Sequence, residues 1–148
     1  MNIVFHALIG LLLAKLCGVR SLPGVSMGVL FSIIPDFDHV PHLMNALKTG
    51  RFGVGSRSSL HELVGLALIL SGSLIVKAVR PHLFPLTFSC GLSHFVVDFL
   101  TRPSRPLYPF STREVDLKLY PRGLREMIIW DVILTVGLGL IYVITPQV

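Results

Sequence analysis

The chain has 148 residues and a formal net charge of +5, and 52% of its residues are apolar while only 14% are charged. Soluble globular domains carry about 25% charged residues, so this composition excludes an ordinary water-facing surface and indicates an integral membrane protein with a single domain, residues 1–148. The positive charge favours contact with anionic membrane lipids or with a phosphate-bearing substrate, and no stretch resembles a nucleic-acid-binding motif.

Five apolar segments follow one another along the chain. They lie at about 3–19, 22–35, 60–79, 83–101 and 127–145. A membrane-spanning helix needs roughly 20 residues, with a usable range of about 17–25, and all the segments except the second meet this requirement. We therefore predict an all-α fold, namely a multi-pass membrane bundle of about five helices.

The second segment ends abruptly in the polar stretch Pro-Asp-Phe-Asp-His, residues 35–39. Pro35 is expected to end or kink the helix and to direct the acidic residues that follow it inward. Two carboxylates and an imidazole within four residues fit either a polar helix end in water or a group of metal ligands. Asp36, Asp38 and His39 are therefore candidate site residues, and the choice depends on where the other histidines and acids lie.

The third and fourth segments carry further candidate ligands. His61 and Glu62 open the third segment, and the fourth contains His94 and Asp98 four residues apart. That spacing places both side chains on one helix face, and an imidazole with a carboxylate suits zinc or manganese. Ionisable residues at membrane depth are costly and usually functional, although a structural His–Asp hydrogen bond would use the same pair.

The ionisable residues gather at one membrane face if successive segments cross in alternate directions. All eight acids then lie on or near the face that also holds His6, at positions 36, 38, 62, 98, 114, 116, 126 and 131. We expect this face to carry a polar site. Most of the 13 Lys and Arg residues lie there too, and the positive-inside rule favours a cytoplasmic location for it.

The fifth segment contains Asp131, and an intramembrane carboxylate is functional by default. We expect Asp131 to support a metal-binding histidine or to pair with an arginine of the preceding loop. Trp130, Tyr108 and Tyr120 are expected to anchor the chain at the membrane interface.

The predicted site combines metal ligands, catalytic residues and substrate-binding cations. The candidate ligands of a divalent metal, zinc first and manganese second, are His6, Asp36, His39, His61, His94 and Asp98. A metal ion would lower the pKa of its bound water and supply a nucleophile. Asp38 and Glu62 are the candidate catalytic residues, although Glu62 points about 100° away from its neighbour His61 on a helix. Arg102, Arg105 and Arg113 can bind an anionic substrate or contact lipid headgroups.

The order of these motifs resembles the YdjM-like family of membrane-bound metal-dependent hydrolases. The matching parts are the early helical His, IIPDFDH, the His that opens the next long helix, and HFVVDFLTRPSRPLYPFS, which together cover roughly residues 3–113. More remotely, the pattern is similar to zinc-dependent phospholipase C and P1-type nucleases, which are all-helical. The resemblance implies direct metal ligands at His6, Asp36, His61, His94 and Asp98, with Asp98 able to bridge two ions. A further His-x-x-x-Glu pair of the phospholipases is missing, which favours one or two ions.

The leading hypothesis is a membrane hydrolase that attacks a phosphoester or similar bond of a lipid or lipid-linked substrate with metal-activated water. The alternative is a non-enzymatic helical membrane protein that permeates ions or protons, or scaffolds partners. A relay for permeation should cross the bilayer, whereas these residues cluster at one face. A metal-binding protein without activity is a third interpretation.

Overall fold

The computed structural model describes residues 2–38, 40, 44, 62–121 and 123–146. Its helices are α1 (Ile3–Leu16), α2 (Leu22–Ile33), α4 (Leu63–Val79), α5 (Phe84–Thr101) and α6 (Leu124–Ile144), with short 3₁₀ turns η1 (Ile34–Asp38) and η3 (Pro81–Leu83). Over these ranges no strand forms, and Ser104 and Val115 make an isolated antiparallel bridge. The predicted all-α fold is confirmed.

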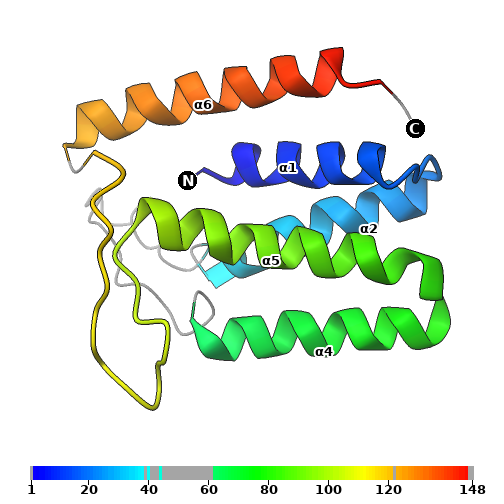
Figure 1. The fold of residues 1–148 in the computed structure, drawn as a ribbon, viewed down its shortest axis with the longest axis horizontal. Coiled ribbons are helices and arrows are strands. Elements are labelled where there is room, and N and C mark those ends of the chain that lie inside the picture. Colours follow the sequence, from blue (N-terminus) through cyan, green and yellow to red (C-terminus); the bar gives the residue numbers. More distant parts are fainter. Residues whose placement is uncertain (1, 39, 41–43, 45–61, 122, 147–148) are drawn as a thin grey trace.

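The helices lie side by side as a bundle with two distinct ends (Figure 1). α1 packs against α2 and α5, α4 covers α5 on one side, and α6 lies along α1 on the other. One end holds the start of α1, the end of α5 and the start of α4. The other end holds the α1–α2 turn, η3 and the end of α6. This arrangement brings residues that are far apart in the sequence to a common end.

Local signals explain where the first two helices begin and end. The side chain of Asn2 caps α1 by accepting the N–H of Phe5 at 2.8 Å. Gly18 adopts a positive φ of 66°, which ends α1 at Leu16, earlier than the predicted boundary at 19, and turns the chain back. α2 stops at Ile33 and continues as η1 through Pro35, as the proline predicted.

Close helix contacts depend on small residues. A Cβ atom at Gly10 of α1 would lie 2.7 Å from the Ser32 hydroxyl and 2.9 Å from the Val29 Cα of α2. A side chain at this position would therefore collide with the backbone of the neighbouring helix. Small residues allow this close approach in membrane bundles, and Gly10 sets the spacing between α1 and the end of α2 that leads into η1.

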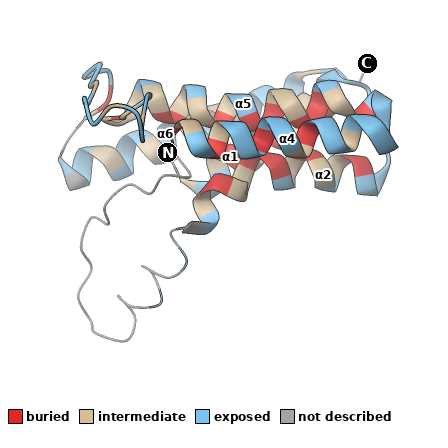
Figure 2. Cartoon of the chain, turned by 90° about the horizontal axis from the view of Figure 1, so that it is seen from below, coloured by how far each residue is buried: buried red, intermediate tan, exposed pale blue. Residues whose placement is uncertain are grey.

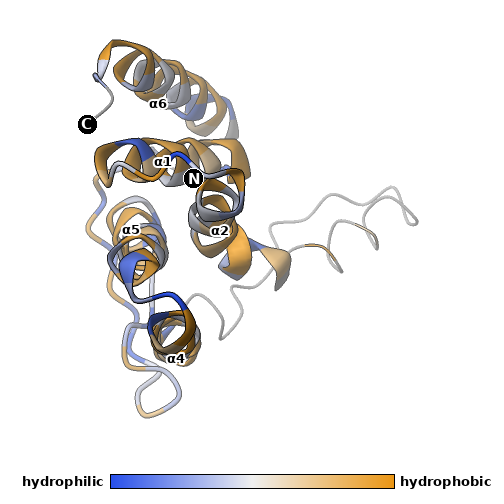
Figure 3. Cartoon of the chain, turned by 90° about the vertical axis from the view of Figure 1, so that its right-hand side faces the viewer, coloured by the Kyte–Doolittle hydropathy of each residue, from blue (hydrophilic) through white to orange (hydrophobic). Residues whose placement is uncertain are grey.

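The outer surface of the bundle suits lipid. Buried residues concentrate between α1, α2, α4 and α5, whereas none of the α6 side chains whose burial is described is buried (Figure 2). The outward faces carry large apolar side chains, for example Leu22 at 78% and Ile144 at 77% exposure, and Figure 3 shows the hydrophobic colouring of these helices. Segments Pro81–Thr101 and Arg125–Ile144 are long and apolar enough to span a membrane, with mean hydropathy 1.5 and 2.3.

Candidate metal centre

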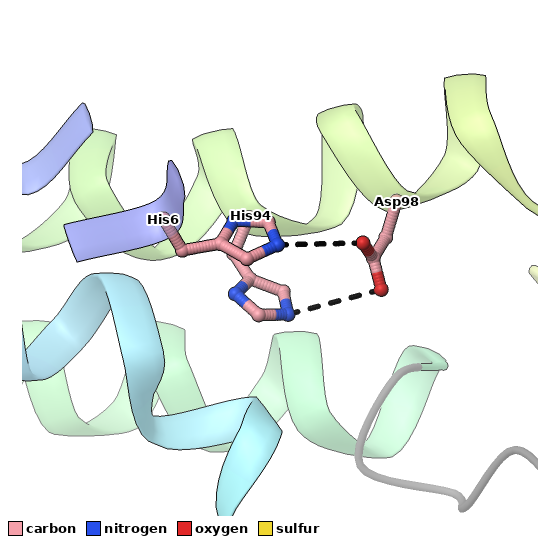
Figure 4. A group of neighbouring side chains, drawn as sticks. All are labelled: His6, His94 and Asp98. Atoms are coloured by element: carbon pink, nitrogen blue, oxygen red, sulfur yellow. Dashed lines mark ion pairs between the residues drawn. The ribbon is translucent and has the colours of Figure 1, made fainter. Parts of the chain in front are cut away.

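Three buried ionisable side chains meet at the end of the bundle that holds the start of α1. His6 comes from α1, while His94 and Asp98 lie one turn apart on α5 (Figure 4). His6 is 1% exposed, His94 0% and Asp98 4%. One donor atom from each lies within 4.8 Å of the others. Such a group could hold a metal ion, as the sequence predicted for these residues.

The carboxylate of Asp98 faces both imidazole rings, one with each oxygen. Its Oδ1 lies 3.5 Å from Nε2 of His6, and its Oδ2 lies 3.9 Å from Nε2 of His94. Asp36 of η1 joins the group, with its Oδ1 3.8 Å from Nε2 of His94. These separations exceed an ordinary N–H···O bond, and ligand atoms bound at about 2.0–2.1 Å to one tetrahedral ion lie roughly 3.3 Å apart. The spacing of the donors therefore approaches that of a metal-binding set.

The other ring nitrogen of His94 fixes the orientation of its imidazole. Nδ1 lies 2.7 Å from the main-chain carbonyl oxygen of Ser32. A carbonyl oxygen only accepts hydrogen bonds, so Nδ1 carries a proton and donates it. Nε2 is then the nitrogen available to a metal. Histidine ligands in metal sites typically donate their second N–H to a carbonyl or carboxylate in this way.

The two imidazole rings stack on one another. The centroids of His6 and His94 lie 3.8 Å apart, with an angle of 22° between the ring planes. Two imidazolium ions would repel each other at this separation, so the stacked rings would not both be charged. Neither nitrogen of the buried His6 ring makes a hydrogen bond within the described part of the chain. A cation beside Asp98 would satisfy Nε2 of His6.

Helical periodicity explains why these side chains converge. His6, Gly10 and Ala14 form the buried face of α1 at intervals of four residues. His94 and Asp98 occupy the buried face of α5 with the same interval. Because Gly10 lets α1 approach α2 closely, His6 reaches the end of α5 where Asp98 lies.

Glu62 has a structural partner at the start of α4. Its carboxylate is 3% exposed and accepts the Arg105 N–H with both oxygens, at 3.1 and 3.0 Å. The Nε of Arg105 lies 3.9 Å away, and its guanidinium carbon lies 4.9 Å from the Tyr108 ring centroid. Glu62 therefore anchors the segment after α5. The sequence predicted a catalytic role for Glu62 and did not predict this anchoring contact.

The other predicted substrate-binding arginines lie in the same segment. Arg102 directly follows α5, and its N–H donates to the carbonyl of Asp98 at 2.9 Å. Its side chain is half-buried, whereas Arg113 is exposed. Arg102 therefore lies directly after the last turn of α5, four residues along the chain from Asp98.

The predicted partner of Asp131 is corrected by the structure. Its Oδ1 accepts the hydroxyl of Tyr120 at 2.5 Å, where a histidine or a loop arginine was expected. Tyr120 is only 7% exposed, so it ties the long α5–α6 connection to α6 and does not reach outward as an interface anchor. The sequence did not point to Ser32 as the hydrogen-bond partner of His94, because Ser32 contributes its main-chain carbonyl oxygen and not its side chain.

Three predicted site residues are not part of this group as the structure describes it. His39 and His61 lie outside the described residues. Asp38 is described only as the last residue of η1, and its side chain is not placed. The group assembled from residues of known position is therefore His6, Asp36, His94 and Asp98.

An apolar groove of about 220 Å³ lies beside the centre, between α4 and α5. Leu66 of α4 and Phe95 and Phe99 of α5 contribute to its walls. Phe95 and Phe99 directly follow His94 and Asp98, so they lie at the same depth and about 100° around the helix. The groove and the metal ligands therefore use adjacent faces of the same two turns of α5.

The sequence matches the YdjM inner membrane protein family over residues 1–146. The chain belongs to this family. Membership confirms the resemblance drawn from the motifs and places this YdjM family member in a membrane, in agreement with its apolar helices. No curated protein and no solved structure matches the chain.

Proposed function

We propose that this YdjM family member is a metal-dependent hydrolase that cleaves a phosphoester bond in a membrane lipid or a lipid-linked substrate. One observation carries the proposal, namely the Asp98 carboxylate that faces His6 with one oxygen and His94 with the other. The hydrogen bond from His94 to Ser32 supports it by presenting Nε2 to the carboxylates.

The donor set fits zinc or manganese. Two imidazole nitrogens with carboxylate oxygens from Asp98 and Asp36 match the ligands that these ions accept. Such an ion would lower the pKa of a bound water molecule and so supply a nucleophile at neutral pH. His6, His94, Asp98 and Asp36 together would supply enough donor atoms for one or two ions per chain.

Residues around the centre suit a substrate with an anionic head and an apolar tail. Arg102 follows the end of α5, and a guanidinium group binds phosphate oxygens with two parallel hydrogen bonds. The groove lined by Leu66, Phe95 and Phe99 can hold an acyl or isoprenyl chain at the depth of the ligands. Together they support a lipid phosphoester as the substrate class.

Metal content tests the site first. We would measure zinc and manganese in detergent-purified protein by elemental mass spectrometry, after reconstitution with either ion. One or two equivalents are expected in the wild type, with loss in Asp98→Ala and Asp36→Ala. Asp131→Asn is the matched control, since Asp131 is also a helix carboxylate but bonds to Tyr120, and it should retain the metal. A wild-type protein without metal would overturn the proposal and turn the His–Asp group into a structural polar network.

Activity is tested separately from metal binding. Metal-loaded protein would be incubated in mixed micelles with phosphatidic acid, phosphatidylglycerol and an isoprenyl phosphate, and product release would be followed by mass spectrometry. We expect metal-dependent hydrolysis of at least one lipid, retained in Asp131→Asn and abolished in Asp98→Ala. Full metal occupancy with no hydrolysis of any of these lipids would reject the hydrolase and leave a metal-binding membrane protein.

A further inference from the structure

The connection between α5 and α6 carries a short apolar tip. Residues 106–110, Pro-Leu-Tyr-Pro-Phe, contain no charged side chain, whereas residues 111–118 contain four. Leu107 is 60% exposed and Phe110 is 86% exposed. Contact between large apolar side chains and water is unfavourable, and apolar groups exposed together mark interaction sites. The tip is therefore expected to have an apolar partner.

The backbone of the connection holds the tip in a closed loop. Ser104 and Val115 exchange two main-chain hydrogen bonds, of 2.9 and 2.8 Å, at its base. Between them the Tyr108 N–H donates to the carbonyl oxygen of Arg105 at 2.9 Å. The carboxylate of Glu62 accepts the Arg105 N–H and so ties the loop to the start of α4. The apolar side chains of the tip are therefore presented by a loop that is both closed and anchored.

The loop lies at the level where the membrane-spanning helices end. The segments Pro81–Thr101 and Arg125–Ile144 are long and apolar enough to span a membrane, so the connection leaves and re-enters the bilayer at one boundary. It runs sideways past the start of α4 and does not extend beyond the first turn of α6 along the helix axes (Figure 1, Figure 2). A loop that runs along this boundary meets the headgroup region and not bulk water.

The tip also borders a lipid-facing part of the bundle. Pro106, its first residue, lines the apolar groove between α4 and α5 together with Leu66 and Val96. Val96 is 47% exposed, so the groove opens toward the outside of the bundle, where lipid surrounds a membrane protein. Apolar surface therefore continues from the groove to the tip. This continuity and the level of the loop indicate lipid as the partner.

We propose that the tip inserts Leu107 and Phe110 into the interfacial region of the bilayer, beside the groove between α4 and α5. Phe and Leu side chains are favourable at the boundary between headgroups and acyl chains. Residues 113–118 carry the charges of the loop and remain among the headgroups. The inserted tip would hold the mouth of the groove at the membrane surface. The proposal involves no metal ligand and does not depend on the hydrolase proposal.

Tryptophan fluorescence of the full chain in vesicles tests the insertion. Trp130 is the single tryptophan of the sequence, so Trp130→Phe provides a background in which Leu107→Trp reports on the tip while Phe110 is kept. The protein would be reconstituted in phosphatidylcholine with or without brominated acyl chains, and iodide on both sides of the membrane would be the aqueous quencher. We expect a blue-shifted emission that brominated lipid quenches and iodide does not.

Phe110→Ser in this reporter background tests the contribution of the native side chain. We expect the emission to shift to the red, quenching by brominated lipid to fall and quenching by iodide to rise. Thr112→Ser is the matched control, because Thr112 is an exposed neighbour on the polar side of the loop, and it should change none of these quantities. Phe110 is 86% exposed, so its replacement leaves the packing of the bundle intact, and an unchanged thermal midpoint checks this.

Three results would overturn the proposal. Quenching of the reporter by iodide and not by brominated lipid would place the tip in water. Protection from both quenchers would show that protein covers the tip, whether a second copy of the chain or another partner. Equal quenching with and without Phe110→Ser would show that Phe110 does not hold the tip in the membrane. None of these readouts requires a metal or hydrolysis, so they test the tip separately from the proposed function.

Discussion

His94 of α5 donates its Nδ1 hydrogen to the main-chain carbonyl of Ser32, 2.7 Å away near the end of α2. This bond joins the candidate metal ligand to the helix that leads into η1 and Asp36. The orientation of the ring therefore depends on the packing of α2 against α5. The stability of the bundle and the geometry of the candidate metal centre should therefore be coupled.

A metal bound at the candidate centre should stabilise the bundle, because the candidate ligands come from α1, η1 and α5. A ligand that binds only the folded state at 100 times its Kd stabilises it by about 2.7 kcal/mol. We expect a chelator to lower the thermal unfolding midpoint and added zinc or manganese to restore it. His94→Ala should show no response to either treatment. A chelator response of equal size in His94→Ala would place the metal elsewhere.

Gly10→Ala should weaken both the fold and the centre. The added Cβ would lie 2.9 Å from the Val29 Cα, so α1 and α2 must separate, and overpacking of this kind typically costs about 1–3 kcal/mol. His6 lies one turn away on the same face, so metal content should fall together with the thermal midpoint. Both quantities are measured on the same purified sample.

Gly139→Ala is the control for this change. A Cβ at Gly139 would meet nothing within 4 Å, and alanine is favoured over glycine in a helix by about 1 kcal/mol. We expect an unchanged or slightly higher midpoint and full metal content. If both alanine variants lost stability equally, close packing at Gly10 would not be the cause.

Glu62→Gln should loosen the segment after α5 without removing the metal. The carboxylate accepts the Arg105 N–H with both oxygens, and replacing a charged acceptor by a neutral one weakens a hydrogen bond by about 1 kcal/mol. Amide hydrogen exchange at Arg105 should be roughly fivefold faster by that estimate. Glu114→Gln changes an exposed residue of the same connection and should leave the exchange rate unchanged.

The alternative role of Glu62 makes a different prediction. If Glu62 acts as a general base, Glu62→Gln should abolish lipid hydrolysis in addition to speeding exchange at Arg105. Hydrolysis that is retained in Glu62→Gln would assign Glu62 to anchoring alone.

Tyr120→Phe should weaken the attachment of the α5–α6 connection to α6, because it removes the hydrogen bond from the Tyr120 hydroxyl to Asp131. Burial and the hydrogen bond to Asp131 raise the pKa of Tyr120 above its ordinary value of about 10. The folded state therefore holds the phenol proton more tightly than the unfolded chain does. The resulting contribution to the free energy of unfolding is complete below about pH 10 and declines as the pH rises further. At neutral pH the variant should lose about 1.5–3 kcal/mol, the range for hydrogen bonds to charged groups.

The measurement for Tyr120→Phe is the thermal midpoint between neutral pH and about pH 11. The difference from the wild type should be largest at neutral pH and should shrink in alkaline solution. Tyr108→Phe preserves a ring under the Arg105 guanidinium and should behave as the wild type. A difference that grows with pH would contradict the proposed linkage.

The sequence predicted the parts of the centre that depend on helix periodicity. His94 and Asp98 were paired by their spacing, and alternate crossing of the segments placed His6 at the same end. Pro35 correctly marked the end of α2. These features follow from local geometry and from the scarcity of ionisable residues in apolar segments, so a single sequence reveals them.

Other features depend on contacts that no local pattern encodes. The partner of His94 is the main-chain carbonyl of Ser32, which any residue type would supply. Asp131 bonds to Tyr120, which lies in an irregular connection without periodicity. α6 begins at Leu124, before the predicted position 127, because Arg125 and Glu126 in its first turn interrupt the apolar pattern but not the helix.

The shortness of α1 and α2 has a consequence for the surrounding bilayer. The 14 residues of α1 span about 21 Å, and the continuous apolar helix Leu22–Phe37 spans about 24 Å at 1.5 Å per residue, whereas the hydrocarbon core is about 30 Å thick. Such hydrophobic mismatch is relieved by local thinning of the membrane. Headgroups beside α1 would then lie deeper than elsewhere in the leaflet, and a lipid phosphate could approach His6 and Asp98 while its acyl chains remain in the bilayer.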